Sequence, residues 1–342
     1  MVTIKDVAKL AGVSTSTASR AMHDSSIISE ATKERVRQAM AELDYSPNFS
    51  AQNLVNRKTN TIGIVLPVRE NQDSLGDNPF FMQIIQGISS VCSQNDYMVS
   101  LATGRSDREL EKNTQTLIRS GNIDKIIFLY SKKGDPIFTA VKKQRKVSSV
   151  VVGQAYDAPS PNIHYVDNNN YQASQDATKF LWEKGYRHIV YAYTDMQELV
   201  QSDRYEGYRA YATQKQLTDY SLHLSRTNDE ENVAKLQSFL ADHPEVQAFI
   251  ACDDIQAIRL QRLFKIIDVA PDRYAIFGFN NSLITKIASP ALTSVDIFPY
   301  ELGEKAATVL LGQAENSQNQ TLIIPHKIIE RESTPSLTVK TN

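Results

Sequence analysis

The amino-acid sequence predicts an α/β protein: a small all-α segment at the N-terminus, then two doubly wound parallel-sheet subdomains. Short helical patterns fill residues 3–45, continuous apolar runs of strand length begin at Thr61, and helical patterns separate these runs. Apolar runs of this kind are typical of parallel strands that are buried on both faces. Their alternation with helices indicates βαβ units, and roughly nine strand candidates after Thr61 are enough for two sheets.

The composition excludes several classes of protein. Hydrophobic residues make up 41% and charged residues 22% of the 342 residues, as in a soluble globular chain. No apolar run approaches the roughly 20 residues that a membrane helix needs, and Met1 is followed by no apolar signal core. Cys92 and Cys252 lack CxxC spacing and fit reduced thiols. We therefore expect a cytoplasmic protein without a membrane segment.

Positive charge is slightly enriched at the N-terminus. Residues 1–60 contain eight Lys and Arg against six Asp and Glu, whereas the rest of the chain has 29 basic and 33 acidic residues. This asymmetry is compatible with nucleic-acid binding, but it is too small to indicate it alone.

The first two helices are expected on either side of Gly12. Thr3 is placed to cap the first helix, with Asp6 at the capping-box position. Gly12 suits a tight turn, and Ser14 or a neighbouring residue is placed to cap the second helix.

A third helix is expected to begin after Ser29, which is placed as its cap. Val36, Met40 and Leu43 recur at helical spacing and predict one apolar face. The polar stretch that follows, YSPNFSAQNLVNRKTN (45–60), holds a short marginal helical pattern, and we interpret it as a linker.

Seven apolar runs are the clearest strand candidates, and the helical patterns 107–121 and 175–185 are examples of what separates them. The runs are TIGIVLP (61–67), YMVSLAT (97–103), KIIFLYS (125–131), SVVVG (149–153), HIVYAYT (188–194), AFIACDD (248–254) and YAIFGFN (274–280). Open parallel sheets bind ligands in the crevice at the carboxyl ends of their strands. We therefore expect a ligand site between the two subdomains.

Small hydroxyl side chains crowd the second helical pattern, TSTASRAM (15–22), although Ser and Thr are weak helix formers. In a helix-turn-helix, the second helix enters the DNA major groove, where short polar side chains keep its backbone close to the bases. Arg20 is able to pair with guanine or to bind a phosphate. On this spacing alone, an ordinary helical hairpin remains the alternative.

The whole N-terminal segment resembles the DNA-binding headpiece of the lactose-repressor (LacI) family. The resemblance is carried by TIKDVAKLAGVSTSTASRAM (3–22), SEATKERVRQAMAELDYSPN (29–48) and AQNL (51–54). The βα-rich order of the remaining chain agrees with it. It implies that the hydroxyl-rich helix is the recognition helix.

The resemblance also implies a domain organisation. A helix-turn-helix headpiece would occupy residues 1–46, and a hinge helix with its linker residues 47–60. An effector-binding and dimerisation domain of periplasmic-binding-protein type would occupy residues 61–342. Its two subdomains would be 61–160 with 293–325, and 161–292 with 326–342.

The same resemblance implies which residues contact DNA. Thr15, Ser16 and Arg20 stand where the family reads bases, and the small side chains at the first two positions imply fewer or water-mediated base contacts. Leu54 matches the hinge leucine that wedges into the minor groove and kinks the duplex. The other implied DNA-binding residues, placed for phosphates, capping or the hinge, are Thr3, Ser14, Thr17, Ser19, Asn48 and Ala51.

Effector positions follow from the resemblance as well. Arg204, in DRYEGY, stands where the family binds sugar hydroxyls or a corepressor carboxylate. Asp253 and Asn280 follow the AFIAC and AIFGF strands, where the family has pocket residues. The implied effector-binding residues are Phe80, Phe81, Asn168, Arg204, Asp253 and Asn280.

Motifs of enzymes are missing: GxSxG, HExxH, GxxxxGK[ST] and a strand-linked GxGxxG do not occur. Asp253 and Asp254 are interpreted as one crevice-facing residue and one helix cap, not as catalytic carboxylates. DNNN (167–170) lacks the Gly and Glu of a calcium loop, and we interpret it as a turn with an acceptor-rich rim. We expect no enzyme activity, no cofactor and no metal.

The sequence therefore predicts a repressor of carbohydrate-utilisation genes that binds pseudo-palindromic double-stranded operator DNA as a homodimer. GFNNS (278–282) and PALTSVDI (290–297) are most similar to the maltose-operon regulators of the family. This implies a maltose or maltodextrin effector that releases the operator, with another sugar such as sucrose, or a corepressor, as the alternative. The polar end TPSLTVKTN (334–342) cannot form the heptad seam of a tetramer. A solute-binding protein of a sugar transporter would have a signal peptide and no headpiece.

Overall fold

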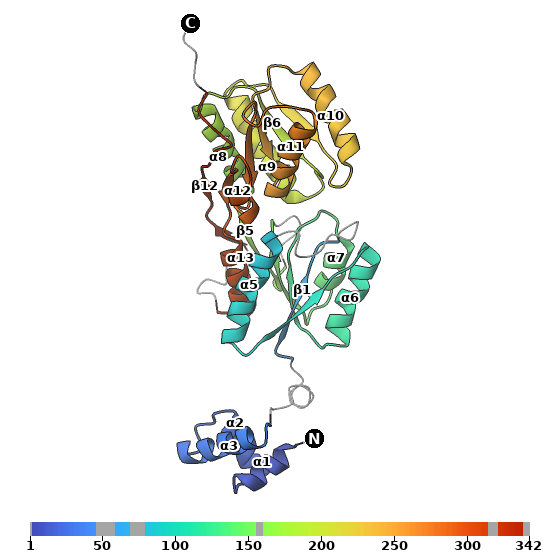
Figure 1. Ribbon diagram of the computed structural model, residues 1–342. Coiled ribbons are helices and arrows are strands. Elements are labelled where there is room, and N and C mark those ends of the chain that lie inside the picture. Colours follow the sequence, from blue (N-terminus) through green and yellow to red (C-terminus); the bar gives the residue numbers. More distant parts are fainter. Residues whose placement is uncertain (1, 46–58, 69–78, 155–159, 314–320, 338–342) are drawn as a thin grey trace. The chain divides into compact units, whose positions relative to one another are not determined.

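The structure is a computed structural model that describes residues 2–45, 59–68, 79–154, 160–313 and 321–337. The chain forms two compact units, Met1–Thr59 and Asn60–Asn342 (Figure 1). The two units are described separately below.

Three helices form the described part of the first unit: α1 (Ile4–Leu10), α2 (Thr15–Met22) and α3 (Glu30–Glu42). Val7, Ala18 and Val36 are fully buried between them. Gly12 has a φ of +65°, so the turn uses the left-handed conformation that glycine adopts without strain. Ser29 caps α3 by accepting a hydrogen bond from the Thr32 amide at 3.4 Å, which confirms the predicted cap.

The first sheet of the second unit has the strand order β11-β5-β4-β3-β1-β2, and every pair of neighbours is parallel. Helices α5 and α13 pack on one face and α6 and α7 on the other (Figure 1). Its strands are β1 (Thr61–Val65), β2 (Met98–Ala102), β3 (Lys125–Phe128), β4 (Ser148–Val152), β5 (Ile163–Asn168) and β11 (Thr321–Ile324). Its helices are α5 (Pro79–Gln94), α6 (Asp107–Arg119), α7 (Pro136–Lys142) and α13 (Pro299–Leu310).

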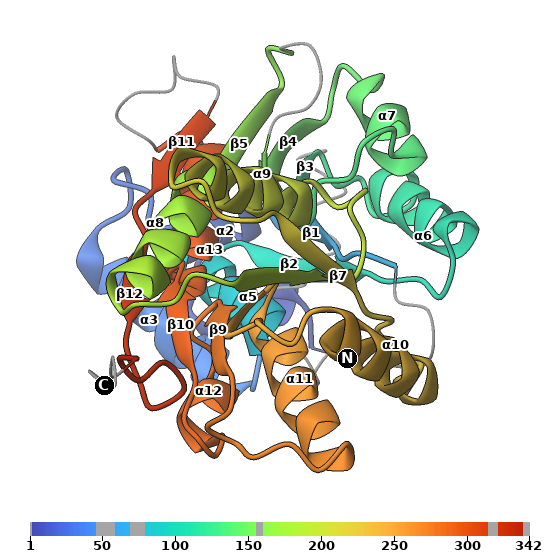
Figure 2. The same ribbon diagram turned by 90° about the horizontal axis from the view of Figure 1, so that it is seen from above.

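The second sheet has the order β12-β10-β9-β8-β6-β7 and is parallel except for the β10–β12 pair. Helices α8 and α9 cover one face, and α10 and α11 cover the other (Figure 2). Its strands are β6 (Ile189–Tyr193), β7 (Tyr220–His223), β8 (Ala248–Ala251), β9 (Ala275–Phe279), β10 (Thr293–Asp296) and β12 (Lys327–Ile329). The helices are α8 (Asn170–Glu183), α9 (Leu199–Gln214), α10 (Asp229–Asp242), α11 (Asp254–Ile266) and α12 (Leu283–Ile287).

Both sheets are buried on both faces, which is why their strands read as continuous apolar runs. In β1, Ile64 and Val65 point to opposite faces and are both fully buried, and Phe249 and Ile250 of β8 do the same. Each of the seven predicted runs forms a strand, and the predicted doubly wound α/β fold is confirmed.

Five strands of the described chain were not among the named candidates: β5, β7, β10, β11 and β12. They are short or polar, so their pattern lacks an apolar run. The interpretation of DNNN (167–170) as a turn was wrong. Asp167 and Asn168 end β5, while Asn169 caps α8 through the Gln172 amide at 2.9 Å. The buried side chains of this segment are hydrogen-bonded inside the protein.

Two glycines allow α5 and α13 to pack backbone against backbone. A Cβ atom on Gly87 would overlap the carbonyl oxygen of Tyr300, and one on Gly303 would overlap that of Ile84. The contact is therefore reciprocal, and neither backbone can retreat without separating the two helices.

We expect Gly87→Ala to lower the free energy of unfolding by about 1–3 kcal/mol, because overpacking a close helix contact forces the backbones apart. Thermal unfolding followed by circular dichroism checks this. Gln86→Ala is the matched control, since Gln86 is the exposed neighbour on the same helix. Equal midpoints for the two variants would contradict the close packing.

Candidate DNA-binding headpiece and effector site

The first helix of the headpiece begins at the predicted capping box. The Asp6 carboxylate accepts hydrogen bonds from the Thr3 amide at 2.9 Å and the Thr3 hydroxyl at 2.7 Å. These bonds favour the charged carboxylate and hold the pKa of Asp6 below its ordinary value. Thr3 therefore fixes the start of α1.

The start of α2 is held by hydroxyl groups. Ser14 Oγ accepts from the Thr17 amide at 3.1 Å and lies 2.8 Å from the hydroxyls of both Ser16 and Thr17. Ala18 and Ala21 bury the inner side of the helix. The predicted cap is confirmed, and the hydroxyl-rich sequence still forms a regular helix because its small alanines pack inward.

The outer side of α2 presents the predicted reading residues. Thr15, Ser16 and Arg20 are exposed, and Ser19 is half-buried, with its carbonyl oxygen 2.7 Å from His23 Nδ1. Arg20 has no ion-pair partner among the described residues. Asn48, Ala51 and Leu54 lie outside the described residues.

Asp24, the acidic residue nearest to Arg20 in the sequence, forms its ion pairs with other residues of the headpiece. Asp24 pairs with Arg37 at 2.7 Å and lies 3.7 Å from Lys33 Nζ on the same helix, α3. This arrangement leaves the guanidinium of Arg20 available to a phosphate or a base.

Arg204 is the central charge of the candidate effector site. It is buried within α9, donates from Nε to Asn170 Oδ1 at 3.0 Å and from Nη1 to the Cys252 carbonyl at 2.6 Å. Its guanidinium lies 4.2 Å from the ring centre of Phe279. Burial lowers its pKa from the ordinary value. Within the described chain, these hydrogen bonds use two of its five N–H donors.

Asp253 and Asp254, after β8, do not take the expected roles of one crevice-facing residue and one helix cap. Asp253 itself caps α11, with Oδ1 accepting from the Gln256 amide at 2.7 Å. Asp254 was expected to be the cap or the crevice residue, but its carboxylate is buried and accepts from the Ser282 amide, the Ser282 hydroxyl and the Ser294 hydroxyl at 2.6–2.8 Å. It therefore ties the start of α11 to β10 and to the start of α12.

The other predicted effector residues lie in different environments. Phe81 is buried, Phe80 is half-buried, and their rings meet edge to face at 5.2 Å. Asn280 follows β9 with a φ of +105°, and its backbone N–H donates to the Val295 carbonyl at 2.8 Å. Asn168 is buried, and its side-chain nitrogen donates to backbone carbonyls.

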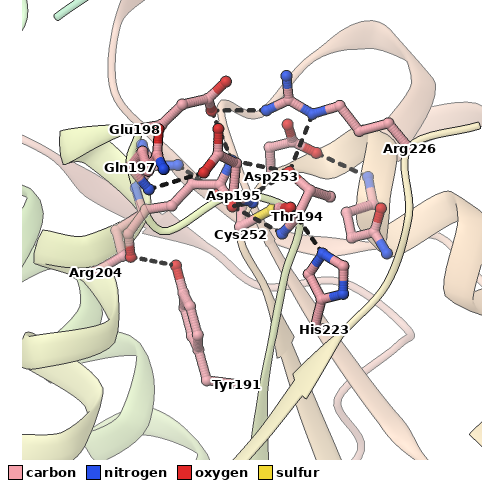
Figure 3. A network of polar contacts seen from close by, with 12 residues as sticks. Tyr191, Thr194, Asp195, Gln197, Glu198, Arg204, His223, Arg226, Cys252 and Asp253 are labelled. Carbon is pink, nitrogen blue, oxygen red and sulfur yellow. Dashed lines mark hydrogen bonds and ion pairs between the residues drawn. The ribbon is translucent and has the colours of Figure 1, made fainter. Parts of the chain in front are cut away.

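A polar network beside Arg204 was missed by the sequence reasoning (Figure 3). Arg226 donates to Glu198 at 2.6 Å and to the Thr194 hydroxyl at 3.0 Å. Gln201 Oε1 accepts from the Thr194 amide at 2.9 Å, and its amide nitrogen donates to Glu198 at 2.6 Å. These residues lie in the segments that follow β6 and β7. Polar residues after two neighbouring strands could have indicated the network from the sequence, but β7 was not predicted as a strand.

Two contacts join this network to loops that follow strands of the first sheet. Lys132, after β3, and Glu198 form an antiparallel backbone bridge. The side-chain amide of Gln154, after β4, lies against the Asp203 carboxylate at the start of α9. Polar groups from the carboxyl ends of both sheets therefore meet here, as the topology predicts for a ligand crevice.

Burial raises the pKa of three carboxyl groups around these residues. It raises the pKa of Asp167 to about 7, of Asp203 to about 6 and of Asp254 to about 7. The Arg204 charge opposes the effect at Asp167 and Asp203. In the described residues, no group of three or more His, Cys, Asp and Glu side chains is placed to hold a metal ion.

Both the N-terminal headpiece and the domain that follows it match known protein families. Residues 3–48 match the family described as bacterial regulatory proteins, lacI family, and residues 178–334 match the periplasmic binding protein-like domain. The HTH-type transcriptional regulator MalR of Streptococcus pneumoniae is 34% identical over 338 residues, with 96% of this chain and 99% of the relative covered. MalR of Staphylococcus xylosus is 33% identical over 345 residues, with 98% and 99% covered.

A solved structure titled "transcriptional regulator CelR-cellobiose complex" is 27% identical, covers 97% of this chain and 100% of its own, and has a TM-score of 0.70. A helix-turn-helix headpiece joined to a domain of this fold defines a DNA-binding transcriptional regulator. The chain belongs to the lacI family of bacterial regulatory proteins. None of the described helices has the length and apolar character needed to cross a membrane.

The buried carboxyl of Asp254 makes a pH prediction. A pKa raised from 3.8 to about 7 means that stability is present at low pH and is lost as pH rises from about 4 to 7. Asp254→Asn stays neutral, so we expect it to gain about 2 kcal/mol relative to the wild type between pH 5 and pH 8.

Denaturant unfolding of both proteins at the two pH values measures this difference. Asp242→Asn, which alters an exposed carboxyl on α10, should show no such gain. A pH-independent difference between Asp254→Asn and the wild type would show that Asp254 ionises without penalty.

Proposed function

We propose that this chain is a homodimeric repressor of carbohydrate-utilisation genes that leaves its operator when a maltose-type sugar binds. The observation that carries the proposal is the pairing of an exposed polar face on α2 with a buried arginine and an aspartate at the carboxyl ends of the second sheet. The relatives named MalR support the maltose assignment.

DNA reading falls to the outer face of α2. Thr15, Ser16 and Arg20 would contact bases, because their side chains are exposed on one helix face. Ser14, Thr17 and Ser19 would position the helix start on phosphates, whose negative charge suits a helix N-terminus. Thr3 would act at the start of α1, and Asn48 and Ala51 in the hinge segment.

Two headpieces reading related half-sites require a dimer with a two-fold axis. Leu283 and Ile287 of α12 are 61% and 73% exposed, one helical turn apart, on a short helix of the second subdomain. We propose that this exposed apolar pair forms part of the contact with the second copy.

We expect Arg20→Ala and Leu54→Ala each to weaken operator binding by about 1–3 kcal/mol, with little change on random DNA. Arg20 would lose a base contact, and Leu54 would lose the wedge that kinks the duplex. Fluorescence anisotropy with operator and scrambled duplexes at one salt concentration measures both affinities.

Arg35→Ala is the matched control for charge, because Arg35 is an exposed arginine on α3. It should weaken both duplexes alike. If Arg20→Ala behaves as Arg35→Ala does, then α2 is not the reading helix.

The effector side offers complementary groups for a neutral sugar. A carboxylate accepts from hydroxyls, while guanidinium and amide groups donate to them. Asp253 has one oxygen used as the cap, and we propose that its other oxygen binds a sugar hydroxyl beside Arg204. Asn280 and the half-buried Phe80 would complete the contacts, with Phe81 supporting Phe80 from below.

We expect maltose and maltotriose to weaken operator binding, and Asp253→Asn to require at least tenfold more maltose for the same release. Asn keeps the helix cap but removes the charged acceptor. Titration of maltose, maltotriose, sucrose and guanine into the anisotropy assay checks this. Asp268→Asn, an exposed position beyond α11, is the control.

Release by sucrose alone would reassign the sugar, and tightening by any of the four compounds would reverse the direction of the response. A wild-type response in Asp253→Asn would remove Asp253 from the effector site.

A further inference from the structure

The chain passes between the two sheets at three places, each a few residues long. The first crossing joins the end of β5 to α8, the second joins β10 to α13, and the third joins β11 to β12. Any change in the relation of the two sheets must bend all three crossings, because they are the covalent connections between the sheets.

One side chain in the first crossing, that of Asn168, forms hydrogen bonds with the backbone of the second and third crossings. Asn168, the last residue of β5, donates from Nδ2 to the Ile297 carbonyl at 3.1 Å in the second crossing. The same nitrogen lies 3.0 Å from the Ile324 carbonyl and 3.4 Å from the Pro325 carbonyl in the third. An amide nitrogen carries two hydrogens, so it can serve one carbonyl in each of the two crossings.

The surroundings leave Asn168 little freedom. The residue is 3% exposed, and its backbone amide donates to Asp167 Oδ1 at 2.8 Å. Ile297 and Ile324, which supply two of the carbonyls, are each 3% exposed. A buried carbonyl that loses its donor cannot turn to water, so the contact is costly to break.

A short chain of hydrogen bonds connects this point to Arg204. Asn170 accepts from Arg204 Nε at 3.0 Å and donates from its own nitrogen to Asp167 Oδ1 at 3.1 Å. Asp167 Oδ1 is the atom that also holds the Asn168 backbone. A shift of Arg204 therefore reaches the first crossing through two side chains.

The second crossing contains a residue in an uncommon backbone conformation. Phe298 has φ +51° and ψ +60°, a left-handed conformation that is uncommon for an aromatic residue. Its amide donates to Asp296 Oδ1 at 2.8 Å. Two hydrogen bonds therefore constrain this crossing around Ile297. One joins Phe298 to the Asp296 side chain, and the other joins the Ile297 carbonyl to the Asn168 side chain.

We infer that Asn168 is a positioning residue that pins the three crossings together, so that the crossings bend as one coupled unit when an effector binds at Arg204 and the two subdomains move relative to each other. It acts through the backbone and not as a sugar contact. The effect on effector response rests on the proposed function, whereas the pinning of the crossings does not. Without the Asn168 contacts, each crossing bends independently. The difference in effector affinity between the two subdomain arrangements then changes operator affinity less.

Asn168→Asp and Asn169→Asp form a matched pair, since each replaces an amide with a carboxylate one residue apart. In Asn168→Asp the carboxylate faces carbonyl oxygens, whereas in Asn169→Asp the new side chain is exposed and can still cap α8. We expect Asn168→Asp to reduce the ratio of operator affinities without and with maltose at least fivefold. Maltose affinity of the free protein, measured by calorimetry, should change less than threefold. Asn169→Asp should keep the wild-type ratio.

Hydrogen exchange tests the pin without reference to any sugar or operator. In the free full-length protein, Asn168→Ser should increase exchange at least fivefold in peptides covering 295–300 and 324–329, and Asn169→Ser should not. This variant also serves if Asn168→Asp fails to fold.

Unchanged exchange in Asn168→Ser would overturn the inference, and so would a wild-type operator ratio in folded Asn168→Asp. A tenfold loss of maltose affinity in Asn168→Asp would overturn it in favour of a direct sugar contact. If the wild type ignores maltose but the exchange result holds, the proposed effector fails and the pin stands.

Discussion

A guanidinium taken out of water needs protein groups to replace its hydration, and Arg204 imposes this demand on the second unit. Three elements answer it: Asn170 at the start of α8, the Cys252 carbonyl after β8, and the ring of Phe279 at the end of β9. One buried charge thereby holds together the elements that would surround a ligand.

The headpiece follows a different rule. Its buried core consists mostly of alanine and valine, so it contributes little apolar area, and small domains with such cores are marginally stable. The helix caps formed by Thr3, Ser14 and Ser29 then carry a larger share of its stability. The small core also lets α2 sit close to its neighbours while Thr15, Ser16 and Arg20 stay exposed.

Much of the fold could be predicted because buried parallel strands must be apolar on both faces, as Ile64 and Val65 illustrate. β5 escaped that logic, since Asp167 and Asn168 are polar residues satisfied by partners more than a hundred residues away or by their neighbours. Periodicity carries no information about such partners. The same limit applies to Asp253 and Asp254. Their order after the strand does not show which carboxylate accepts hydrogen bonds from the distant Ser282 and Ser294. Arg204 could be found only through resemblance.

The topology connects these observations. Parallel strands bring their carboxyl ends to one edge, and a chain that leaves one sheet for another must depart from that same edge. Residues at these strand ends and the crossings are therefore neighbours by construction, as the path from Arg204 through Asn170 to Asp167 and Asn168 demonstrates. A ligand that shifts Arg204 need not send a signal through a long series of side chains. Three hydrogen bonds lead from Arg204 through Asn170 and Asp167 to the backbone of Asn168, which lies in the first of the segments that any movement of the subdomains must bend.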